Sequence, residues 1–220
     1  MRKAIDHLKS ADPVMKQIIE AVGSYKISYR EPEFESLVRS IVYQQLSGKA
    51  AATIYGRLEA ATARGGKVRP AAILKLGEEG LRPLGLSSQK ARYITDLAER
   101  TLARKVQFSK LNEMEDGAVI EHLTQVKGVG VWTVHMFLMF ALRRHDVLPV
   151  GDLGIRNAMH KAYALESAPA PAQMEEIAAS WRPFRTIACW YLWRSLDGVA
   201  EIQQPVVEVG KDRSLTPAAQ

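Results

Sequence analysis

The sequence predicts an all-α fold, and two observations support this. Apolar residues recur at three- and four-residue spacing along most of the 220 residues, as in the run Phe34, Leu37, Val38, Ile41 and Val42, which is the period of one helix face. Alternating β-branched runs are scarce, and residues 147–150 are too few and too proline-broken for a central strand. Because 47% of the residues are hydrophobic, the chain can bury one substantial core or two small lobes that share a cleft.

Capping residues indicate where the helices begin and end. Asp12 followed by Pro13 is typical of a cap and a first helical position, and Gly23 is a suitable residue to end that helix. Ser87 or Ser88 can cap a later helix. The predicted helices cover residues 12–22, 34–46, 48–62, 87–104, 116–124, 131–143, 153–163, 172–180 and 183–197.

The chain reads as a single domain over residues 1–203. It has no internal repeat, and the alanine- and proline-rich segment 168–172 is short enough to be a connector between helices. Residues 204–220 are polar, charged and proline-containing, so we expect a flexible C-terminal tail there.

Composition narrows the function classes. Thirty Lys and Arg against 24 Asp and Glu give a net charge of +6, which favours a polyanionic partner without identifying it. The single cysteine, Cys189, excludes an intrachain disulfide and a four-cysteine zinc or iron–sulfur site. The chain has no apolar signal-peptide core and no run of about 18 apolar residues, so we expect an intracellular protein without a membrane partner.

A glycine hairpin between two predicted helices is the first candidate functional motif. Gly128 and Gly130 permit a tight turn, so that the amides around them and at the start of the next helix point outward. Such amides form an anion site suited to a DNA phosphate, to which Thr133 can add a hydroxyl and Lys127 a cation. An ordinary glycine-rich turn is the alternative. The apolar helices on both sides favour a helix-hairpin-helix motif over about residues 122–142.

Three blocks of sequence resemble a known family. HLTQVKGVGVWTVHMFLMFAL, DVLPVGDLGIRNAM and SWRPFRTIACWYLWR resemble the helix-hairpin-helix DNA glycosylase superfamily, and within it the 3-methyladenine DNA glycosylase II family. FESLVRSIVYQQLSGKAAATI resembles the region before the hairpin, so the resemblance runs from about residue 33 to 197. It implies a two-lobed helical fold with the active site between the lobes. Larger members carry an N-terminal β-rich domain, and we expect the compact form here.

By this resemblance Asp152 takes the position of the family's catalytic aspartate. Base excision passes through a cationic sugar, and a carboxylate beside C1′ stabilises that charge and can orient or deprotonate water. Asp152 also precedes a predicted helix and suits an N-cap, and the two roles are compatible. Asp146 is the competing acid, for which we expect a structural role in a turn or cap.

The residue at position 132 distinguishes two mechanisms. Superfamily members that also cleave the backbone have a lysine there, which attacks C1′ and forms a Schiff base. This chain has Trp132, and Lys127 lies five residues earlier, where a phosphate contact is favoured. The resemblance therefore implies a monofunctional glycosylase that uses water and leaves an abasic site.

The expected substrates are alkylated purines in duplex DNA: 3-methyladenine, with 7-methylguanine and other modified purines as candidates. Trp132 presents an indole face that attracts a cationic base. By resemblance Trp193 is a second pocket aromatic and Met136 stands where the family often has an aromatic, and Tyr43 joins this substrate-binding group. Core packing is the alternative for each of Trp181, Trp190, Tyr191 and Trp193.

A segment that ends one helix is the candidate wedge that fills the gap left by a flipped base. By resemblance Gln45, Leu46 and Ser47 reach the minor groove, with Leu46 the best apolar wedge. A helix end packed inside the protein is the alternative. Basic residues beside the motifs are further candidates for phosphate contacts: Lys49, Lys90, Arg92 and Arg156, the last of which can instead pair with an acid near Asp152.

The resemblance implies no required cofactor. Family hairpins often hold a structural Na⁺ or K⁺ through carbonyl groups, which correspond here to those of Thr124, Val126 and Val129. We expect a monomer. Two other functions stay open: a non-catalytic helix-hairpin-helix DNA-binding module, which the acid at Asp152 argues against, and a bifunctional glycosylase-lyase for oxidised bases, which Trp132 argues against.

Overall fold

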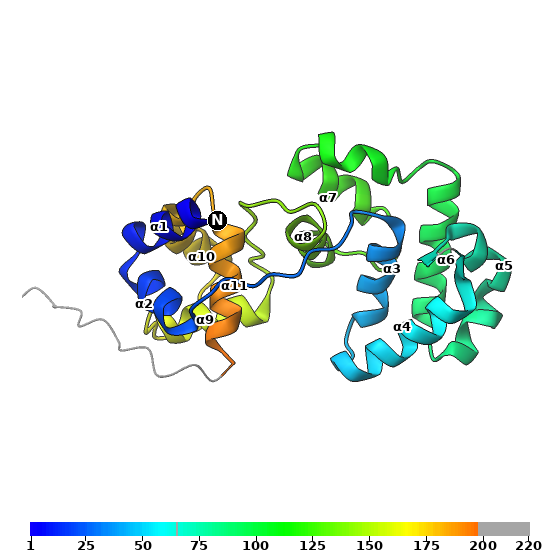
Figure 1. Cartoon of the computed structure of the whole chain (residues 1–220), viewed down its shortest axis with the longest axis horizontal. Helices are drawn as coiled ribbons and strands as arrows, with labels where there is room; N and C mark the ends of the chain where they lie inside the picture. The colour runs from blue at the N-terminus through cyan, green and yellow to red at the C-terminus, as the bar shows by residue number, and fades with distance from the viewer. Residues whose placement is uncertain (65, 198–220) are drawn as a thin grey trace, which may run out of the picture.

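The computed structural model describes residues 1–64 and 66–197 (Figure 1). Its α-helices are α1 (Arg2–Ala11), α2 (Pro13–Val22), α3 (Phe34–Tyr43), α4 (Gly48–Thr62), α5 (Pro70–Leu81), α6 (Ser88–Leu102), α7 (Asp116–Thr124), α8 (Val131–Phe140), α9 (Leu153–Ala162), α10 (Pro171–Ile177) and α11 (Arg185–Ser195). Short 3₁₀ helices occur at Arg82–Leu84, Phe108–Glu113 and Ala178–Trp181. Strands β1 (Ala63–Arg64) and β2 (Lys67–Val68) pair antiparallel. The all-α prediction is confirmed, with this two-residue strand pair as an addition.

The helices form two lobes (Figure 1). One lobe combines the two ends of the described chain, because α2 packs against α11, and α11 in turn packs against α9. The other lobe contains α3 to α6, with α3 and α5 both packed on α6. Residues 23–33 cross from the first lobe to the second without regular structure.

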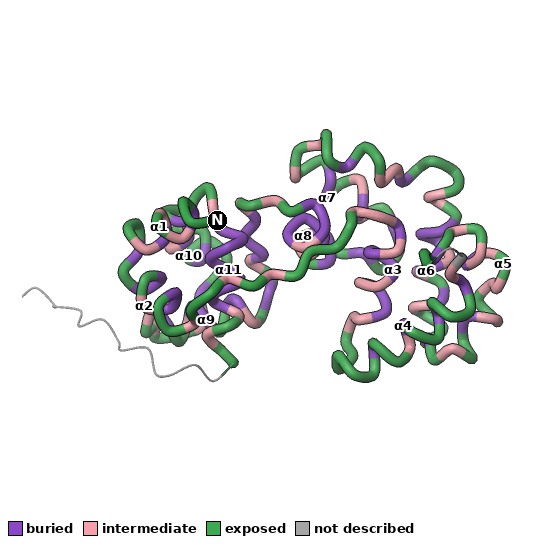
Figure 2. The backbone as a smooth tube through the Cα atoms, viewed as in Figure 1, coloured by how far each residue is buried: buried purple, intermediate pink, exposed green. Residues whose placement is uncertain are grey.

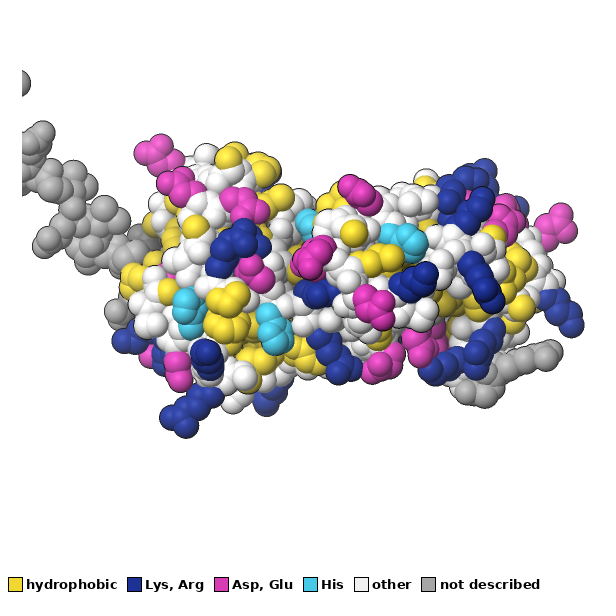
Figure 3. Space-filling model, turned by 90° about the horizontal axis from the view of Figure 1, so that it is seen from above, with side chains coloured by type: hydrophobic (Ala, Val, Ile, Leu, Met, Phe, Trp, Pro, Cys, Tyr) yellow, Lys and Arg dark blue, Asp and Glu magenta, His cyan; other side chains and the backbone are white. Residues whose placement is uncertain are grey.

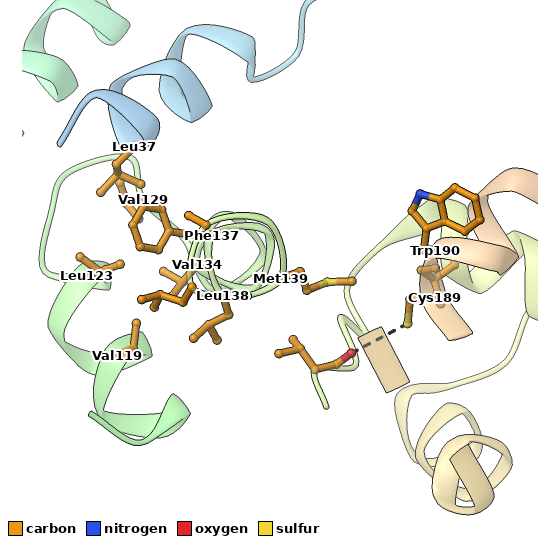
Figure 4. Packing of buried hydrophobic residues seen from close by; sticks show 14 of the residues in the cluster. Leu37, Val119, Leu123, Val129, Val134, Phe137, Leu138, Met139, Cys189 and Trp190 are labelled. Carbon is orange, nitrogen blue, oxygen red and sulfur yellow. Dashed lines mark hydrogen bonds between the residues drawn. The ribbon is translucent and has the colours of Figure 1, made fainter. Parts of the chain in front are cut away.

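Helix α8 lies between the lobes because it is apolar on nearly every face. Its side chains Val134 and Phe137 are buried towards Leu37 of α3 and Leu123 of α7 (Figure 4). Met139 lies on the opposite side, towards α11 (Figure 4). Figure 2 shows most of α8 and residues 185–192 of α11 as buried, whereas the outer helices alternate between buried and exposed residues. The start of α8 is thereby fixed at the junction of the two lobes.

The predicted caps of α2 and α6 are confirmed. Asp12 Oδ1 accepts hydrogen bonds from the amides of Val14 (2.8 Å) and Met15 (2.9 Å), and Gly23 ends α2 with φ of 81°. Ser87 accepts from the amide of Lys90 and caps α6.

Helices α1 and α5 lie outside the predicted ranges. The two helices predicted to run to residues 46 and 143 end three residues earlier in the structure, at Tyr43 for α3 and at Phe140 for α8. Both ends are followed by a residue in the left-handed region, Gln45 with φ of 54° and Arg143 with φ of 58°, which a continuing α-helix does not allow.

Some expectations fall outside the described residues. These are the flexible tail at 204–220 and the domain end at 203.

Over the described part of the chain, no helix is long and apolar enough to cross a membrane. Basic and acidic side chains are interspersed on the face seen in Figure 3, so the net charge is not gathered into one patch there.

Candidate active site

A cleft of about 1260 Å³ lies where the two lobes meet. The lobe of α3 to α6 contributes the end of α3 and the start of α6, and the opposite wall comes from the hairpin and the first residues of α8 and α9. The predicted site residues that line it are Tyr43, Gln45, Leu46, Lys90, Gly128, Trp132, Thr133, Met136 and Asp152. Ser47, Lys127, Gly130 and Trp193 do not line it.

Asp152 is fixed at the start of α9. Its side chain caps the helix, because Oδ1 accepts from the amide of Ile155 at 2.8 Å, as the sequence analysis expected. Oδ1 also accepts from Trp193 Nε1 at 2.9 Å, and Oδ2 accepts from Trp132 Nε1 at 2.7 Å. With 7% of its surface exposed, the carboxylate is held in one orientation by three N–H donors while it still borders the cleft.

The two tryptophans that bind Asp152 differ in position. Trp132 is 44% exposed and lines the cleft. Trp193 is half-buried, does not line the cleft, and stacks on Phe140 with ring centroids 5.9 Å apart. Glycine at position 154 leaves room for Trp193 beside Asp152, because a Cβ on Gly154 would lie 3.0 Å from Trp193 Cδ1 and 3.1 Å from Asp152 Oδ1. Gly154 is not among the predicted site residues, although its place two residues after Asp152 is a usable signal.

The other aromatic residues of this region belong to the core. Trp181 is fully buried and donates to Asp12 Oδ2 at 2.8 Å. Trp190 packs edge-on against Tyr25 with centroids 4.7 Å apart, and Tyr191 donates from its hydroxyl to the carbonyl of Gly23. Core packing, left open by the sequence, is therefore the arrangement of these three.

The hairpin requires glycine at only one of its two glycine positions. Gly128 has φ of 76°, and a Cβ on it would lie 2.0 Å from Tyr93 Cδ2, so both the backbone and the packed ring exclude a side chain. Gly130 has an ordinary φ of −93° and nothing within 4 Å of an added Cβ. The fold itself does not need glycine at 130, and its absent side chain leaves the start of α8 open to close approach.

Several amides of this hairpin are available to an anion. Those of Gly128, Gly130 and residues 131–133 donate to no acceptor within the described residues. The amide of Lys127 is used differently, since it donates to Asp96 Oδ2 at 3.0 Å and so ties the turn to α6. Thr133 is buried, and its hydroxyl accepts from Gln44 Nε2 at 3.3 Å, so its side chain faces α3.

The turn between α3 and α4 is exposed at residues 45–47. The alternative prediction, that this helix end is packed inside the protein, is therefore wrong. Leu46 is 38% exposed, and Ser47 caps α4 by accepting from the amide of Ala50. Gln44, which the sequence analysis did not single out, donates to the carbonyl of Gly128 at 2.9 Å and joins this turn to the hairpin.

Two candidate phosphate contacts, Lys90 and Arg156, donate hydrogen bonds to backbone carbonyls of the protein itself. Lys90 Nζ donates to the carbonyls of Val42 and Gln44, both at 2.7 Å, and closes the end of α3. Burial lowers the pKa of Lys90. Arg156 donates to the carbonyls of Pro169 and Ala168, so it holds the connector and does not pair with an acid near Asp152.

The remaining basic candidates are exposed. Lys49 and Arg92 both lie on the surface. The side chain of Lys127 is 70% exposed, with Nζ at 3.8 Å from Asp96 Oδ1. These three side chains are able to meet a polyanion.

We expect Lys90→Met to lower the free energy of unfolding by about 1–2 kcal/mol, because two carbonyls at the end of α3 lose a charged donor. Urea denaturation measures this loss. Lys49→Met is the matched control, since Lys49 is exposed, and its expected effect is within about 0.5 kcal/mol. Equal stability of the two variants would contradict a structural role for Lys90.

Asp146 has the structural role that the sequence indicated. Its carboxylate accepts from the amide and the Nε of Arg185, at 3.3 and 2.8 Å, and from Arg182 Nη1 at 3.0 Å. Arg185 is only 8% exposed. Asp146 therefore anchors the start of α11 and leaves Asp152 as the acid of the cleft.

The carbonyl groups considered for a monovalent cation are those of Thr124, Val126 and Val129. The Val126 carbonyl accepts one hydrogen bond, from the amide of Val129 at 3.1 Å. Within residues 1–64 and 66–197, the carbonyls of Thr124 and Val129 accept none, so their lone pairs are available. The described residues hold no group of three or more His, Cys, Asp or Glu that could bind a metal ion.

Comparison with known proteins places this chain in a family. The family model described as "HhH-GPD superfamily base excision DNA repair protein" matches residues 38–183. The chain is 34% identical over 211 residues to DNA-3-methyladenine glycosylase 1 of Schizosaccharomyces pombe, covering 94% of this chain and 92% of that protein. The match to the family model includes the hairpin, Trp132 and Asp152.

Two solved structures share the fold. The S. pombe 3-methyladenine DNA glycosylase in complex with abasic DNA superposes with a TM-score of 0.79 at 34% identity, over 89% of this chain and 97% of that one. A DNA-3-methyladenine glycosidase of Bacillus halodurans gives 0.78 at 37% identity, over 87% and 88%. This chain belongs to the HhH-GPD superfamily of base excision DNA repair proteins.

Proposed function

We propose that this protein is a monofunctional DNA glycosylase that releases alkylated purines, first of all 3-methyladenine, from duplex DNA and leaves an abasic site. One observation carries the proposal: the Asp152 carboxylate borders the cleft and is held there by two tryptophans and a helix N-terminus. Two relatives that cover most of the chain, one from Schizosaccharomyces pombe and one from Bacillus halodurans, are named as a 3-methyladenine glycosylase and a 3-methyladenine glycosidase, which supports this substrate.

Asp152 would act on the bond between C1′ and the base. As that bond breaks, its electron pair leaves with the base and neutralises the cationic purine, while positive charge develops on the sugar. An oriented carboxylate beside C1′ stabilises that charge. Water then adds its oxygen to C1′, and Asp152 accepts the proton that water loses.

Trp132 would select the base. Its Nε1 is committed to Asp152, so the indole ring is fixed while 44% of its surface remains exposed at the cleft. A fixed aromatic face stacks on an extruded base, and a cationic base gains roughly 0.5–2 kcal/mol from it. Met136 lies one turn further along α8 and lines the same cleft.

DNA would be held by the exposed parts of the two turns. The open amides of Gly130 and the start of α8, with Lys127 beside them, suit one phosphate. A Na⁺ or K⁺ on the carbonyls of Thr124, Val126 and Val129 would supply positive charge next to that phosphate. Gln45, Leu46 and Ser47 are exposed and would enter the gap that an extruded base leaves in the duplex. One chain contains all these parts, so a monomer suffices.

Incubation of the protein with methylated duplex DNA tests the proposal. We expect free alkylated base, abasic sites in unbroken strands, and no protein–DNA adduct after borohydride treatment, because Trp132 offers no amine. Strand cleavage with a trapped imine would show a bifunctional lyase instead. Tight DNA binding with no released base would show a non-catalytic DNA-binding module.

A further inference from the structure

A buried acid on α6 holds the hairpin from outside the cleft. Asp96 is 8% exposed and does not line the cleft. Its Oδ2 accepts from the backbone amide of Lys127 at 3.0 Å and from Arg100 Nε at 2.8 Å. Lys127 directly precedes the hairpin glycine Gly128 and lies 31 residues after Asp96. The hydrogen bond therefore joins two segments that only the fold brings together.

The bond to Asp96 sets the orientation of one peptide unit. The N–H of Lys127 and the carbonyl of Val126 belong to the same planar peptide and point in opposite directions. With the N–H anchored to Asp96, the carbonyl faces the turn, where it accepts from the amide of Val129 at 3.1 Å. A reversed peptide would break both bonds. Asp96 thereby holds the turn closed around Gly128, whose φ is 76°.

The next peptide of the turn is fixed as well. Its N–H is that of Val129, and its carbonyl, that of Gly128, accepts from Gln44 Nε2 at 2.9 Å. With these two peptides held, the amides of Gly130 and of residues 131–133 donate to no acceptor in the part of the chain that the structure describes. Amides left open at a helix N-terminus suit a phosphate. The closed turn therefore fixes where a phosphate would bind.

The negative charge of Asp96 is itself unfavourable to a DNA-binding surface. Asp96 Oδ1 lies 3.8 Å from Lys127 Nζ, beside the cation that would meet the DNA. An uncompensated carboxylate there would repel a phosphate. Arg100 offsets this charge, because its Nε lies 2.8 Å from Asp96 Oδ2. What Asp96 contributes to the hairpin is therefore an acceptor oxygen at a fixed place.

We propose that Asp96 is a positioning residue for DNA binding: its Oδ2 fixes the peptide between Val126 and Lys127 and so keeps the open amides of the hairpin aligned with a DNA phosphate. The inference rests on the proposed function, in which the hairpin binds that phosphate. In this role Asp96 contacts neither the DNA nor the extruded base. Its loss weakens DNA binding, whereas the chemical step at Asp152 proceeds once the DNA is bound.

The test uses variants that separate the oxygen of Asp96 from its charge. Asp96→Ala removes both. Asp96→Asn loses the charge but keeps an oxygen at the place of Oδ2, and Asp96→Glu keeps the charge but displaces the oxygen by one methylene group. Fluorescence anisotropy with an abasic-site duplex measures Kd. We expect Kd to rise at least about 10-fold in Asp96→Ala and about 5-fold in Asp96→Glu, and to stay within about 3-fold of wild type in Asp96→Asn.

The rate of base release at saturating protein shows that the effect is on binding. We expect the single-turnover rate at saturation to stay within about 3-fold of wild type in every folded variant, because Asp96 makes no contact at the reacting atoms. Asp12→Ala is the matched control. Asp12 is another buried acid that accepts from two backbone amides, at 2.8 and 2.9 Å, but it caps α2 in the other lobe. This control should lose stability and keep the wild-type Kd.

A wild-type Kd in Asp96→Ala would overturn the inference. If Asp96→Ala does not fold, Asp96→Asn and Asp96→Glu decide, and equal affinities of these two variants would overturn it. Tighter DNA binding by both Asp96→Ala and Asp96→Asn would show that Asp96 acts through its charge, which also overturns it. The expected order of affinities without base release by the wild type would instead refute the proposed glycosylase function and support the positioning role of Asp96.

Discussion

Gly128→Ala is expected to destabilise the protein by about 2–4 kcal/mol and to abolish tight DNA binding. Alanine at φ of 76° carries a left-handed backbone penalty, and its Cβ would lie 2.0 Å from the Tyr93 ring. The ring or the hairpin must move, and either shift displaces the open amides before α8. Thermal or urea unfolding measures the stability, and fluorescence anisotropy with an abasic-site duplex measures the binding.

Gly130→Ala is the matched control for the hairpin. Its φ of −93° suits alanine, and nothing lies within 4 Å of the new Cβ. We therefore expect an unchanged unfolding free energy, together with weaker DNA binding because a methyl group stands where a phosphate would approach. A Gly130→Ala protein with wild-type affinity would contradict phosphate binding at this turn.

Local signals in the sequence were enough for most of the helices. The predicted ranges 48–62 and 116–124 coincide with α4 and α7, because a capping serine or a clear apolar period marks them. Helix α1 has no side-chain cap and buries only Ala4 and Leu8. It is stabilised by packing against α2 and the last helices, which the local sequence does not show. Helix α5 is interrupted at Gly77, whose positive φ kinks it and breaks the pattern.

The residues of the candidate site were predictable from the sequence, but the hydrogen bonds between them were not. The position of Asp152 before a helix suggested a cap, and the structure has that cap. The bonds to it from Trp132 and Trp193 arise from α8 and α11, 20 and 41 residues away, and side chains that meet only after folding leave no local pattern. For the same reason Lys90 was expected at a phosphate, whereas it closes the end of α3.

Asp152→Asn is expected to slow base release by at least about 100-fold, because a neutral amide stabilises a cationic sugar poorly and cannot take a proton from water. The amide also cannot accept from all three N–H donors, and its own NH₂ group faces one of them. We expect about 1–3 kcal/mol of lost stability in addition. Single-turnover kinetics at saturating protein separates the chemical step from this loss.

Asp12→Asn controls for the loss of stability. Asp12 is likewise a buried N-cap, accepting from two amides of α2 and from Trp181 Nε1, but it lies outside the cleft. Its replacement should lower the unfolding free energy by a similar amount. Base release at a temperature where both variants are folded should then fall only in Asp152→Asn.

The catalytic role of Asp152 is tested most directly by the single-turnover rate of 3-methyladenine release from methylated duplex DNA by the wild-type, Asp12→Asn and Asp152→Asn proteins. We expect the wild-type and Asp12→Asn proteins to release the base at similar rates. We expect a rate at least about 100-fold lower for Asp152→Asn, although that variant still binds abasic DNA. Release by Asp152→Asn at the wild-type rate would contradict the assignment of Asp152 as the catalytic residue.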